Sequence, residues 1–137
     1  ASFWYRAAGI NTFEIISVYE EYNSFFTLDS YLISQSLEGL RLDEAAGYEE
    51  NSLMISAKIN SFFKRLSWID FNHGDAKSSN FFFSRNKLIA FDLDTSRQRS
   101  FLLLFKRSRE RDVKRILRSF IYSDKIYPFL AKRLNNS

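Results

Sequence analysis

Residues 71–97, FNHGDAKSSNFFFSRNKLIAFDLDTSR, constrain the fold of this chain more than any other segment. Two apolar runs of strand length, NFFFS and KLIAFD, lie within it and are joined by the short polar link RNK. Apolar runs of this length around a polar link are typical of a β-hairpin. Such a hairpin would bring the polar residues before its first strand next to those after its second.

The hairpin would gather Asp75, Asn80 and Asp92, with Lys77 close by. Carboxylate and amide oxygens are ligands that suit Mg²⁺, and a lysine ammonium suits phosphate. A divalent ion that bridges phosphate oxygens supports phosphoryl transfer, and a nearby carboxylate can accept the proton of an attacking hydroxyl. Asp75 is positioned for the second task. Asp and Asn are also common in turns and helix caps, so Asp75 or Asn80 alone would indicate little. The prediction of a phosphoryl-transfer site depends on their combination with Asp92 and the strands between them.

The rest of the chain predicts a mixture of strands and helices. Residues 13–20 and 30–36 are β-branched and aromatic, which indicates two antiparallel strands. The acidic stretch 37–51, with Gly39 and Gly47, reads as an exposed connector. A helix is expected from Asn51, with one apolar face made by Ile55, Ile59, Phe62, Phe63 and Leu66. A second is expected at residues 106–121, with Val113, Ile116, Leu117, Phe120 and Ile121 on its apolar face, and a short final helix near Pro128.

Composition excludes several classes of protein. The chain has 137 residues and is 45% hydrophobic, which is enough for one modest core. It has no cysteine and one histidine, so disulfide scaffolds, thiolate metal sites and histidine zinc clusters are excluded. No apolar run approaches the roughly 20 residues of a membrane span, and the first residues lack the pattern of a secretory signal. We therefore expect a soluble, intracellular protein.

Charge divides unevenly along the sequence. Acidic residues dominate the first 50 positions, whereas the remainder is strongly basic. Arg107, Arg111, Arg115 and Arg118 recur at helical spacing in the basic part, with Glu110 and Asp112 between them. This pattern has two interpretations. The stripe is either a solvated helix face supported by those acids, or a surface for an anionic partner.

The motifs in residues 71–97 resemble those of kinases. DAKSSN matches the D-x-x-x-x-N of the protein-kinase catalytic loop, and Asp92 in LIAFDLD stands where the D-F-G aspartate would. With HGD for HRD and DLD for DFG, the run HGDAKSSNFFF…LIAFDLDTSRQRS most closely resembles bacterial lipopolysaccharide-core kinases, the heptose and Kdo kinase family. The resemblance also covers earlier segments. The end of that family's αC helix and its next strand resemble AAGINTFEIISVYEE, and its strand and hinge that contact adenine resemble SYLISQSLEG. The resemblance therefore spans nearly the whole chain.

The resemblance implies an α+β, protein-kinase-like fold: residues 1–38 as a partial small lobe and 39–137 as the large lobe. It implies a phosphotransferase that uses ATP and Mg²⁺ on a sugar hydroxyl of lipopolysaccharide core. Asp75 would be the base and Lys77 a γ-phosphate contact. Asn80 and Asp92 would be the magnesium ligands. The backbone of Gln35, Ser36 and Leu37 would receive adenine.

Two further residues and the cellular setting follow from the same resemblance. His73 would brace the loop, and Asp94 would either assist the metal or pair with Arg97. The protein would act in the cytoplasm, with peripheral contact at the anionic inner membrane. The sequence shows neither a G-x-G-x-x-G motif nor a lysine in its first nine residues. We therefore expect that the upstream small lobe is absent, and that the fragment alone binds ATP weakly and does not catalyse phosphoryl transfer.

Three alternatives stay open at the level of sequence. The basic residues with phenylalanine and tyrosine also fit a nucleic-acid-binding module, although that reading leaves Asp75, Asn80 and Asp92 unexplained. Another small-molecule kinase, resembling aminoglycoside phosphotransferases, would share the same motif. A kinase-like remnant without activity would explain the missing lysine.

Overall fold

The computed structural model describes residues 1–23, 26–47, 51–99, 101–123 and 125–135. Its helices are α1 (Ser2–Ala7), α2 (Leu42–Ala45), α3 (Ser52–Trp68), α4 (Leu102–Arg118) and α5 (Tyr127–Asn135), with a 3₁₀ turn, η2, at Ser78–Asn80. Its strands are β1 (Asn11–Thr12), β2 (Ile15–Asn23), β3 (Phe26–Ser34), β4 (Leu40–Arg41), β5 (Phe71–Asn72), β6 (Phe81–Ser84), β7 (Lys87–Ala90) and β8 (Arg97–Gln98). The fold is α+β, as predicted.

The β6–β7 hairpin is the centre of the main sheet and confirms the prediction from its two apolar runs. The four-stranded sheet has the order β1-β7-β6-β4, with β1 parallel to β7 and the other pairs antiparallel. Arg85 and Asn86 form the turn, with φ angles of 46° and 62°. Left-handed backbone at both central positions is what a two-residue type I′ hairpin turn requires.

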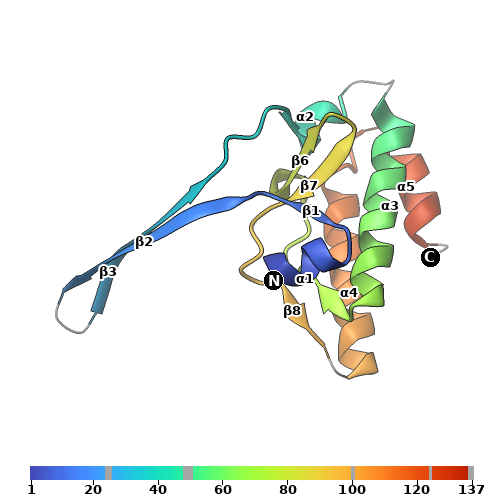
Figure 1. Ribbon diagram of the computed structural model, residues 1–137. Coiled ribbons are helices and arrows are strands. Elements are labelled where there is room, and N and C mark those ends of the chain that lie inside the picture. Colours follow the sequence, from blue (N-terminus) through green and yellow to red (C-terminus); the bar gives the residue numbers. More distant parts are fainter. Residues whose placement is uncertain (24–25, 48–50, 100, 124, 136–137) are drawn as a thin grey trace.

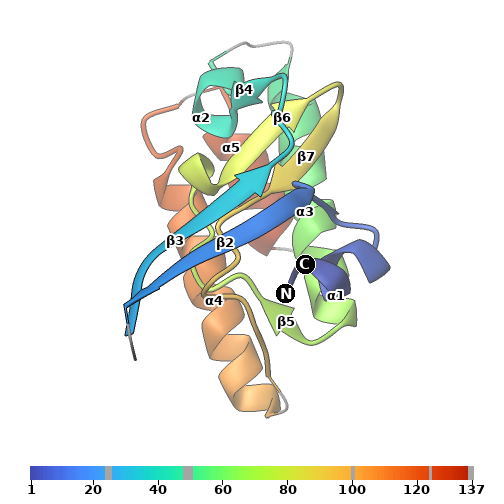
Figure 2. The same cartoon turned by 60° about the vertical axis from the view of Figure 1, so that its left-hand side comes forward.

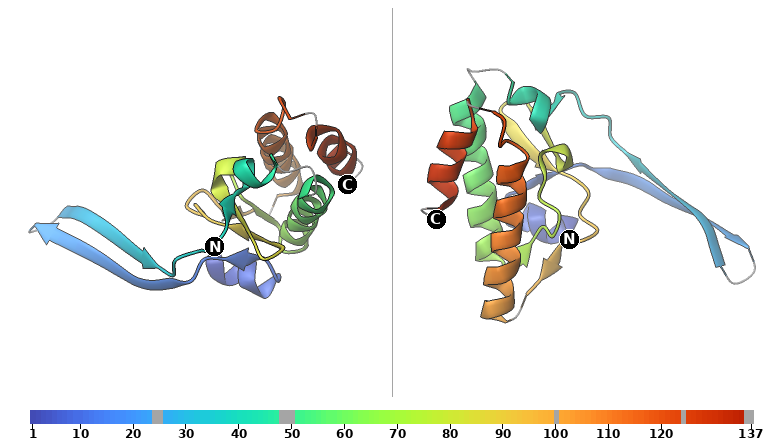
Figure 3. Two further views of the ribbon diagram at one scale, coloured as in Figure 1. Left: turned by 90° about the horizontal axis from the view of Figure 1, so that it is seen from above. Right: turned by 180° about the vertical axis from the view of Figure 1, so that it is seen from behind.

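Helix α3 packs against this sheet, and α4 and α5 pack beside α3 (Figure 3). The five residues predicted for the apolar face of α3 are all buried: Ile55, Ile59, Phe62, Phe63 and Leu66. Helix α3 contacts α5, β5 and β7, and α4 contacts α5. The predicted final helix is α5, with Pro128 in its first turn, where proline removes no helical hydrogen bond.

Helix α4 begins and ends earlier than predicted. It starts at Leu102 and ends at Arg118, so Ile121 lies beyond it and is 52% exposed rather than part of the buried face. The other predicted residues do face the core, since Ile116 and Phe120 are buried and Val113 and Leu117 pack against it. The buried stripe of the helix also includes Phe105, Ser108 and Asp112. Apolar residues at the start of the helix face outward: Phe101, Leu102, Leu103 and Leu104 are each more than half exposed.

The prediction of an exposed acidic connector was wrong for residues 40–46. This segment forms β4, which pairs with β6, followed directly by α2. Leu42 and Ala45 are fully buried, because their i, i+3 spacing places both on one side of the short helix while Asp43 and Glu44 face solvent. The acidic residues 49 and 50 lie outside the described part of the chain.

Strands β2 and β3 confirm the two strands expected near the N-terminus. They form an antiparallel ribbon that projects from the rest of the molecule (Figures 1 and 2). Its apolar side chains are exposed on both faces, among them Ile16, Val18, Leu32 and Ile33. A two-stranded ribbon with apolar side chains exposed on both faces has little stability of its own.

The N-terminal helix belongs to the main core. Tyr5 of α1 is fully buried, and its ring packs edge-on against Phe62 and Phe71. None of the helices in the described residues is both long and apolar enough to cross a membrane.

Candidate active site

Three of the predicted site residues meet directly in the loop between β5 and β6. The Asp75 carboxylate lies 2.9 Å from the Lys77 ammonium. The Asn80 side-chain amide donates to the Asp75 carboxylate at 3.1 Å and to the Asp75 carbonyl at 2.9 Å. Both donations use Nδ2 of Asn80, which leaves its side-chain oxygen for another partner. Asp75, Lys77 and Asn80 therefore form one cluster, called the Asp75 cluster below.

The hairpin brings Asp92 to the same end of the sheet. Phe81 pairs with Ala90, and the Phe91 N–H donates to the Asn80 carbonyl at 3.1 Å. Asp92 follows at once, exposed and with a φ of 55°, a left-handed conformation that aspartate tolerates better than most residues. This is the juxtaposition that the sequence predicted for Asn80 and Asp92.

His73 braces the loop from the core, the role predicted for it. Its side chain is fully buried beside the rings of Phe62 and Phe81, which also contact each other. Burial lowers its pKa, against the opposing effect of the Asp112 and Asp75 carboxylates, so the imidazole is neutral. Its Nδ1 accepts the Asp75 backbone N–H at 3.4 Å, which places the ring proton on Nε2.

Gly74 explains why HGD replaces the HRD of protein kinases. Its φ is +85°, and a Cβ there would lie 2.5 Å from the Thr95 carbonyl oxygen. Only glycine combines that backbone conformation with so close an approach. The loop at Gly74 therefore packs closely against Thr95, in the segment that follows Asp92.

One face of α4 holds the whole loop, which sequence reasoning did not foresee. The Asp112 carboxylate accepts the Gly74 N–H at 3.0 Å. Arg115 donates to the Gly74 carbonyl at 2.6 Å and lies 2.9 Å from the Asp75 carboxylate. The Ser119 hydroxyl accepts the Ser78 N–H at 3.1 Å. Residues 112, 115 and 119 share one helical face, so α4 fixes the backbone on both sides of Asp75.

This finding corrects the sequence interpretation of Asp112. One of the two interpretations of the basic stripe places this residue on a solvated face with Glu110, but it is only 1% exposed. The signal for its burial was its spacing, because residues 105, 108, 112 and 116 follow the 3.6-residue period of a buried stripe. A carboxylate on such a stripe requires a hydrogen-bond partner inside the protein.

A second set of hydrogen bonds ties the N-terminal helix to the same loop. The His73 carbonyl accepts bonds from the hydroxyls of Thr95 and Ser96, at 3.0 and 3.1 Å. The Ser96 hydroxyl also bonds to the Tyr5 hydroxyl at 2.9 Å. Burial raises the Tyr5 pKa well above its usual range, so the phenol stays protonated.

The predicted adenine contacts lie apart from the Asp75 cluster. Gln35, Ser36 and Leu37 follow β3, and the Gln35 N–H donates to the Glu14 carbonyl at 3.0 Å. Within the described residues, no hydrogen bond or ion pair joins this segment to the cluster. Its link to the site is indirect, through β4, which pairs with β6.

The donor set at the cluster fits magnesium. The free side-chain oxygen of Asn80 and the exposed carboxylate of Asp92 are both hard oxygen donors. In the part of the chain that the structure describes, no group of three or more His, Cys, Asp or Glu side chains is arranged to hold a metal. Mg²⁺ does not need one, because it is usually bound by one or two protein oxygens, water and substrate phosphates.

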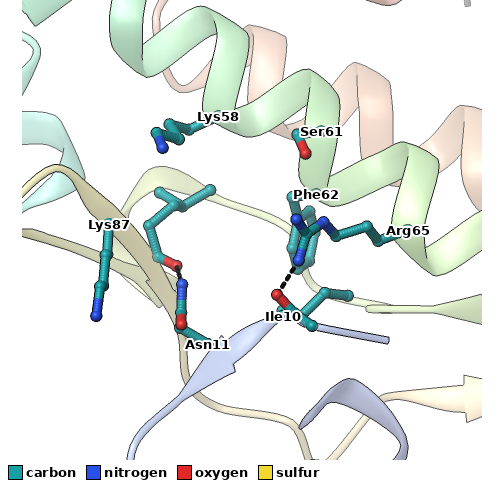
Figure 4. Close-up of a pocket in the computed structure, with 9 residues that line it drawn as sticks. Ile10, Asn11, Lys58, Ser61, Phe62, Arg65 and Lys87 are labelled. Atoms are coloured by element: carbon teal, nitrogen blue, oxygen red, sulfur yellow. Dashed lines mark hydrogen bonds between the residues drawn. The ribbon is translucent and has the colours of Figure 1, made fainter. Parts of the chain in front are cut away.

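A separate basic cavity of about 270 Å³ lies between the α1–β1 turn, α3 and β7 (Figure 4). Lys58, Arg65 and Lys87 line it, and Arg65 donates to the Gly9 carbonyl. None of the predicted site residues lines this cavity, so it is distinct from the Asp75 cluster.

Comparisons with known proteins bear on the fold and on the family of the chain. The chain superposes on the structure of WaaP in complex with acyl carrier protein with a TM-score of 0.70 and 13% identity, over 98% of this chain and 63% of that one. That likeness establishes the protein-kinase-like fold. No curated protein sequence matches the chain. The model of the lipopolysaccharide kinase (Kdo/WaaP) family matches residues 4–133. The chain therefore belongs to the lipopolysaccharide kinase (Kdo/WaaP) family, as its motifs predicted.

The Asp112 bond to Gly74 gives a prediction about stability. Asp112→Ala should lower the free energy of unfolding by about 1–3 kcal/mol, because it leaves a buried N–H without an acceptor. Asp112→Asn should cost less, since its side-chain oxygen can still accept. Urea unfolding measures both. Glu110→Ala, an exposed change on the same helix, should stay within about 0.5 kcal/mol of wild type, and an equal loss in Asp112→Ala and Glu110→Ala would contradict this role.

A second prediction concerns the ionisation of Asp75. Hydrogen bonding from Lys77, then from Asn80, lowers the Asp75 pKa below its ordinary value of 3.8, and the charge of Arg115 adds to the effect. The carboxylate therefore stabilises the fold above the ordinary aspartate pKa, and that contribution is lost as pH falls through the lowered value. Lys77→Met should raise the pKa towards 3.8, as measured by carboxyl ¹³C NMR titration. Lys64→Met, an exposed change on α3, should leave it unaltered, and an unshifted pKa in Lys77→Met would refute the assignment.

Proposed function

We propose that this protein transfers the terminal phosphate of ATP to a sugar hydroxyl of lipopolysaccharide core. The observation that carries the proposal is the direct contact among Asp75, Lys77 and Asn80, at the end of the hairpin that also brings Asp92 there. Membership in the lipopolysaccharide kinase family supports the class of reaction and acceptor. The chain spans 63% of the WaaP chain it matches, so the substrate and activity are proposed for it rather than transferred from that protein.

In this proposal each residue of the site has one task. Asp75 orients the acceptor hydroxyl and accepts its proton. Lys77 lies beside Asp75 and contacts the transferred phosphate. Asn80 and Asp92 hold Mg²⁺, which when bound neutralises charge on the phosphate oxygens. Asp112, Arg115 and Ser119 keep the loop in place.

The proposed division into lobes places adenine at the junction. Residues 1–38 belong to the small lobe and residues 39–137 to the large lobe, with the backbone of Gln35, Ser36 and Leu37 receiving the base. Helix α1 and strand β1 of the small lobe pack against the large lobe, and two features support the division for the rest. The ribbon β2–β3 stands away from the main body, and the whole Asp75 cluster lies after residue 38 (Figure 1).

A nucleic-acid-binding function has less support. Phe81 and Phe83 are buried in the core and cannot stack on bases. Arg115, from the basic stripe that suggested this alternative, pairs with Asp75 instead of facing solvent freely. The kinase proposal accounts for both observations.

The proposed location is the cytoplasmic face of the inner membrane, with peripheral contact. Exposed apolar side chains at residues 101–104 adjoin the basic residues Lys106 and Arg107. Apolar side chains beside basic ones suit an anionic lipid surface, where each base contributes on the order of 1 kcal/mol. The acceptor proposed above is a glycolipid on that surface.

The test is phosphoryl transfer by the full-length protein from labelled ATP to purified lipopolysaccharide core oligosaccharide in the presence of Mg²⁺. Asp75→Asn keeps the size of the side chain but cannot accept the proton, so kcat should fall by about 10²–10⁴-fold. Radiolabel incorporation under saturating ATP measures the change.

Asp43→Asn is the matched control, because Asp43 is an exposed aspartate of α2 that pairs only with Arg41 in the described structure. It should transfer phosphate at the wild-type rate. Wild-type activity in Asp75→Asn would rule out Asp75 as the base.

A further inference from the structure

Four arginines surround a cavity of about 210 Å³ next to the catalytic loop. Arg97 and Arg99 come from the β8 segment, and Arg111 and Arg115 come from α4. Gly74, Thr95 and Ser108 complete most of the wall. Arg115 also lies 2.9 Å from the Asp75 carboxylate, so the cavity adjoins the proposed base directly.

Positive charge in this cavity is only partly balanced by the protein, because Arg115, which pairs with Asp75, is the one wall arginine with an ion pair among the described residues. Its one acidic wall residue is Asp112, whose carboxylate already accepts the Gly74 N–H. Across the described residues, Arg97, Arg99 and Arg111 form no ion pair. The Nε atom of Arg99 is buried and has no hydrogen-bond partner there.

The backbone holds these arginines in place. Strand β8 pairs with β5, Arg97 lies opposite Asn72, and the Arg99 N–H donates to the Asp70 carbonyl at 2.8 Å. Arg111 and Arg115 are one helical turn apart on α4. Guanidinium groups bind phosphate and carboxylate through paired hydrogen bonds, which a lysine ammonium does not provide.

The size of the cavity suits a charged substituent rather than a whole sugar. Pockets that enclose an entire small ligand have volumes of roughly 300 Å³ or more. A neighbouring hollow of about 410 Å³ shares Arg99 and Arg111 and extends past Arg107 to Leu104. A larger acceptor can therefore continue from the arginines towards the exposed apolar start of α4.

We propose that this cavity is an anion subsite for the acceptor, in which Arg97, Arg99, Arg111 and Arg115 bind a phosphate or carboxylate carried near the hydroxyl that reacts. The inference rests on the proposed function only for the role of Asp75. It adds a requirement to that function: the acceptor carries its own oxyanion close to its reactive hydroxyl. A neutral sugar of the same shape is a poor acceptor.

The test is a binding experiment without ATP, using three sugars that differ only at carbon 6: galactose, galactose 6-phosphate and galacturonic acid. NMR titration of the chain at low ionic strength measures their affinities. At least one charged sugar should bind about tenfold or more tightly than galactose, because guanidinium bonds to an anion are charge-assisted. Preference for the phosphate or for the carboxylate identifies which anion the subsite takes.

Arg99→Gln with Arg111→Gln should remove that advantage, reducing affinity for the charged sugar by about tenfold or more while leaving galactose unaffected. Arg118→Gln is the matched control, because Arg118 is an exposed arginine on the same helix that lines neither hollow. Thermal unfolding of each variant checks that it folds, and the single substitutions replace the double variant if it does not.

Equal binding of all three sugars would overturn the proposal. So would an equal loss of affinity in Arg118→Gln and in the cavity variants. Because no phosphoryl transfer is needed, failure of the transfer assay with intact charge-selective binding would count against the proposed function and not against the subsite.

Discussion

The site depends on the attachment of one loop to one helix. Both polar backbone groups of Gly74 are bound by α4: its N–H by Asp112 and its carbonyl by Arg115. Ser119 binds the loop again beyond Asp75. Since three contacts come from one rigid helical face, the position of the Asp75 carboxylate is set by the packing of α4 in the core rather than by the loop itself. The neutral, buried His73 also supports this loop, and its ring packs on Phe62 and Phe81.

Helix α4 also connects the site to its surroundings. Its buried stripe carries Asp112, its flank carries Arg111 and Arg115 beside the proposed acceptor cavity, and its start exposes apolar residues 101–104. The strongly basic second part of the sequence thus has a structural explanation. Arg97, Arg99, Arg111 and Arg115 surround the proposed anion subsite, where their positive charge favours anions, instead of lying on a purely solvated surface.

Local patterns predicted much of this structure, and tertiary contacts account for the rest. The β6–β7 hairpin followed from two apolar runs around a short polar link, and the buried face of α3 from its period. The Asp75, Lys77 and Asn80 contacts followed from their spacing and from the kinase resemblance. Asp112 was missed because a carboxylate among many bases resembles a surface residue, and its partner Gly74 is 38 positions away. The need for glycine at position 74 depends on the Thr95 carbonyl, which no local pattern reveals.

The proposed phosphoryl transfer requires that Asn80 and Asp92 hold a divalent ion beside Asp75. Paramagnetic broadening of NMR signals by Mn²⁺ in the presence of ATP tests it most directly, since it detects weak binding and reports position. The side-chain amide of Asn80 and the ring of His73 should broaden first. Asp92→Asn, which tolerates the same backbone conformation, should greatly reduce the broadening. Undiminished broadening in Asp92→Asn, or broadening centred elsewhere in the chain, would contradict the account.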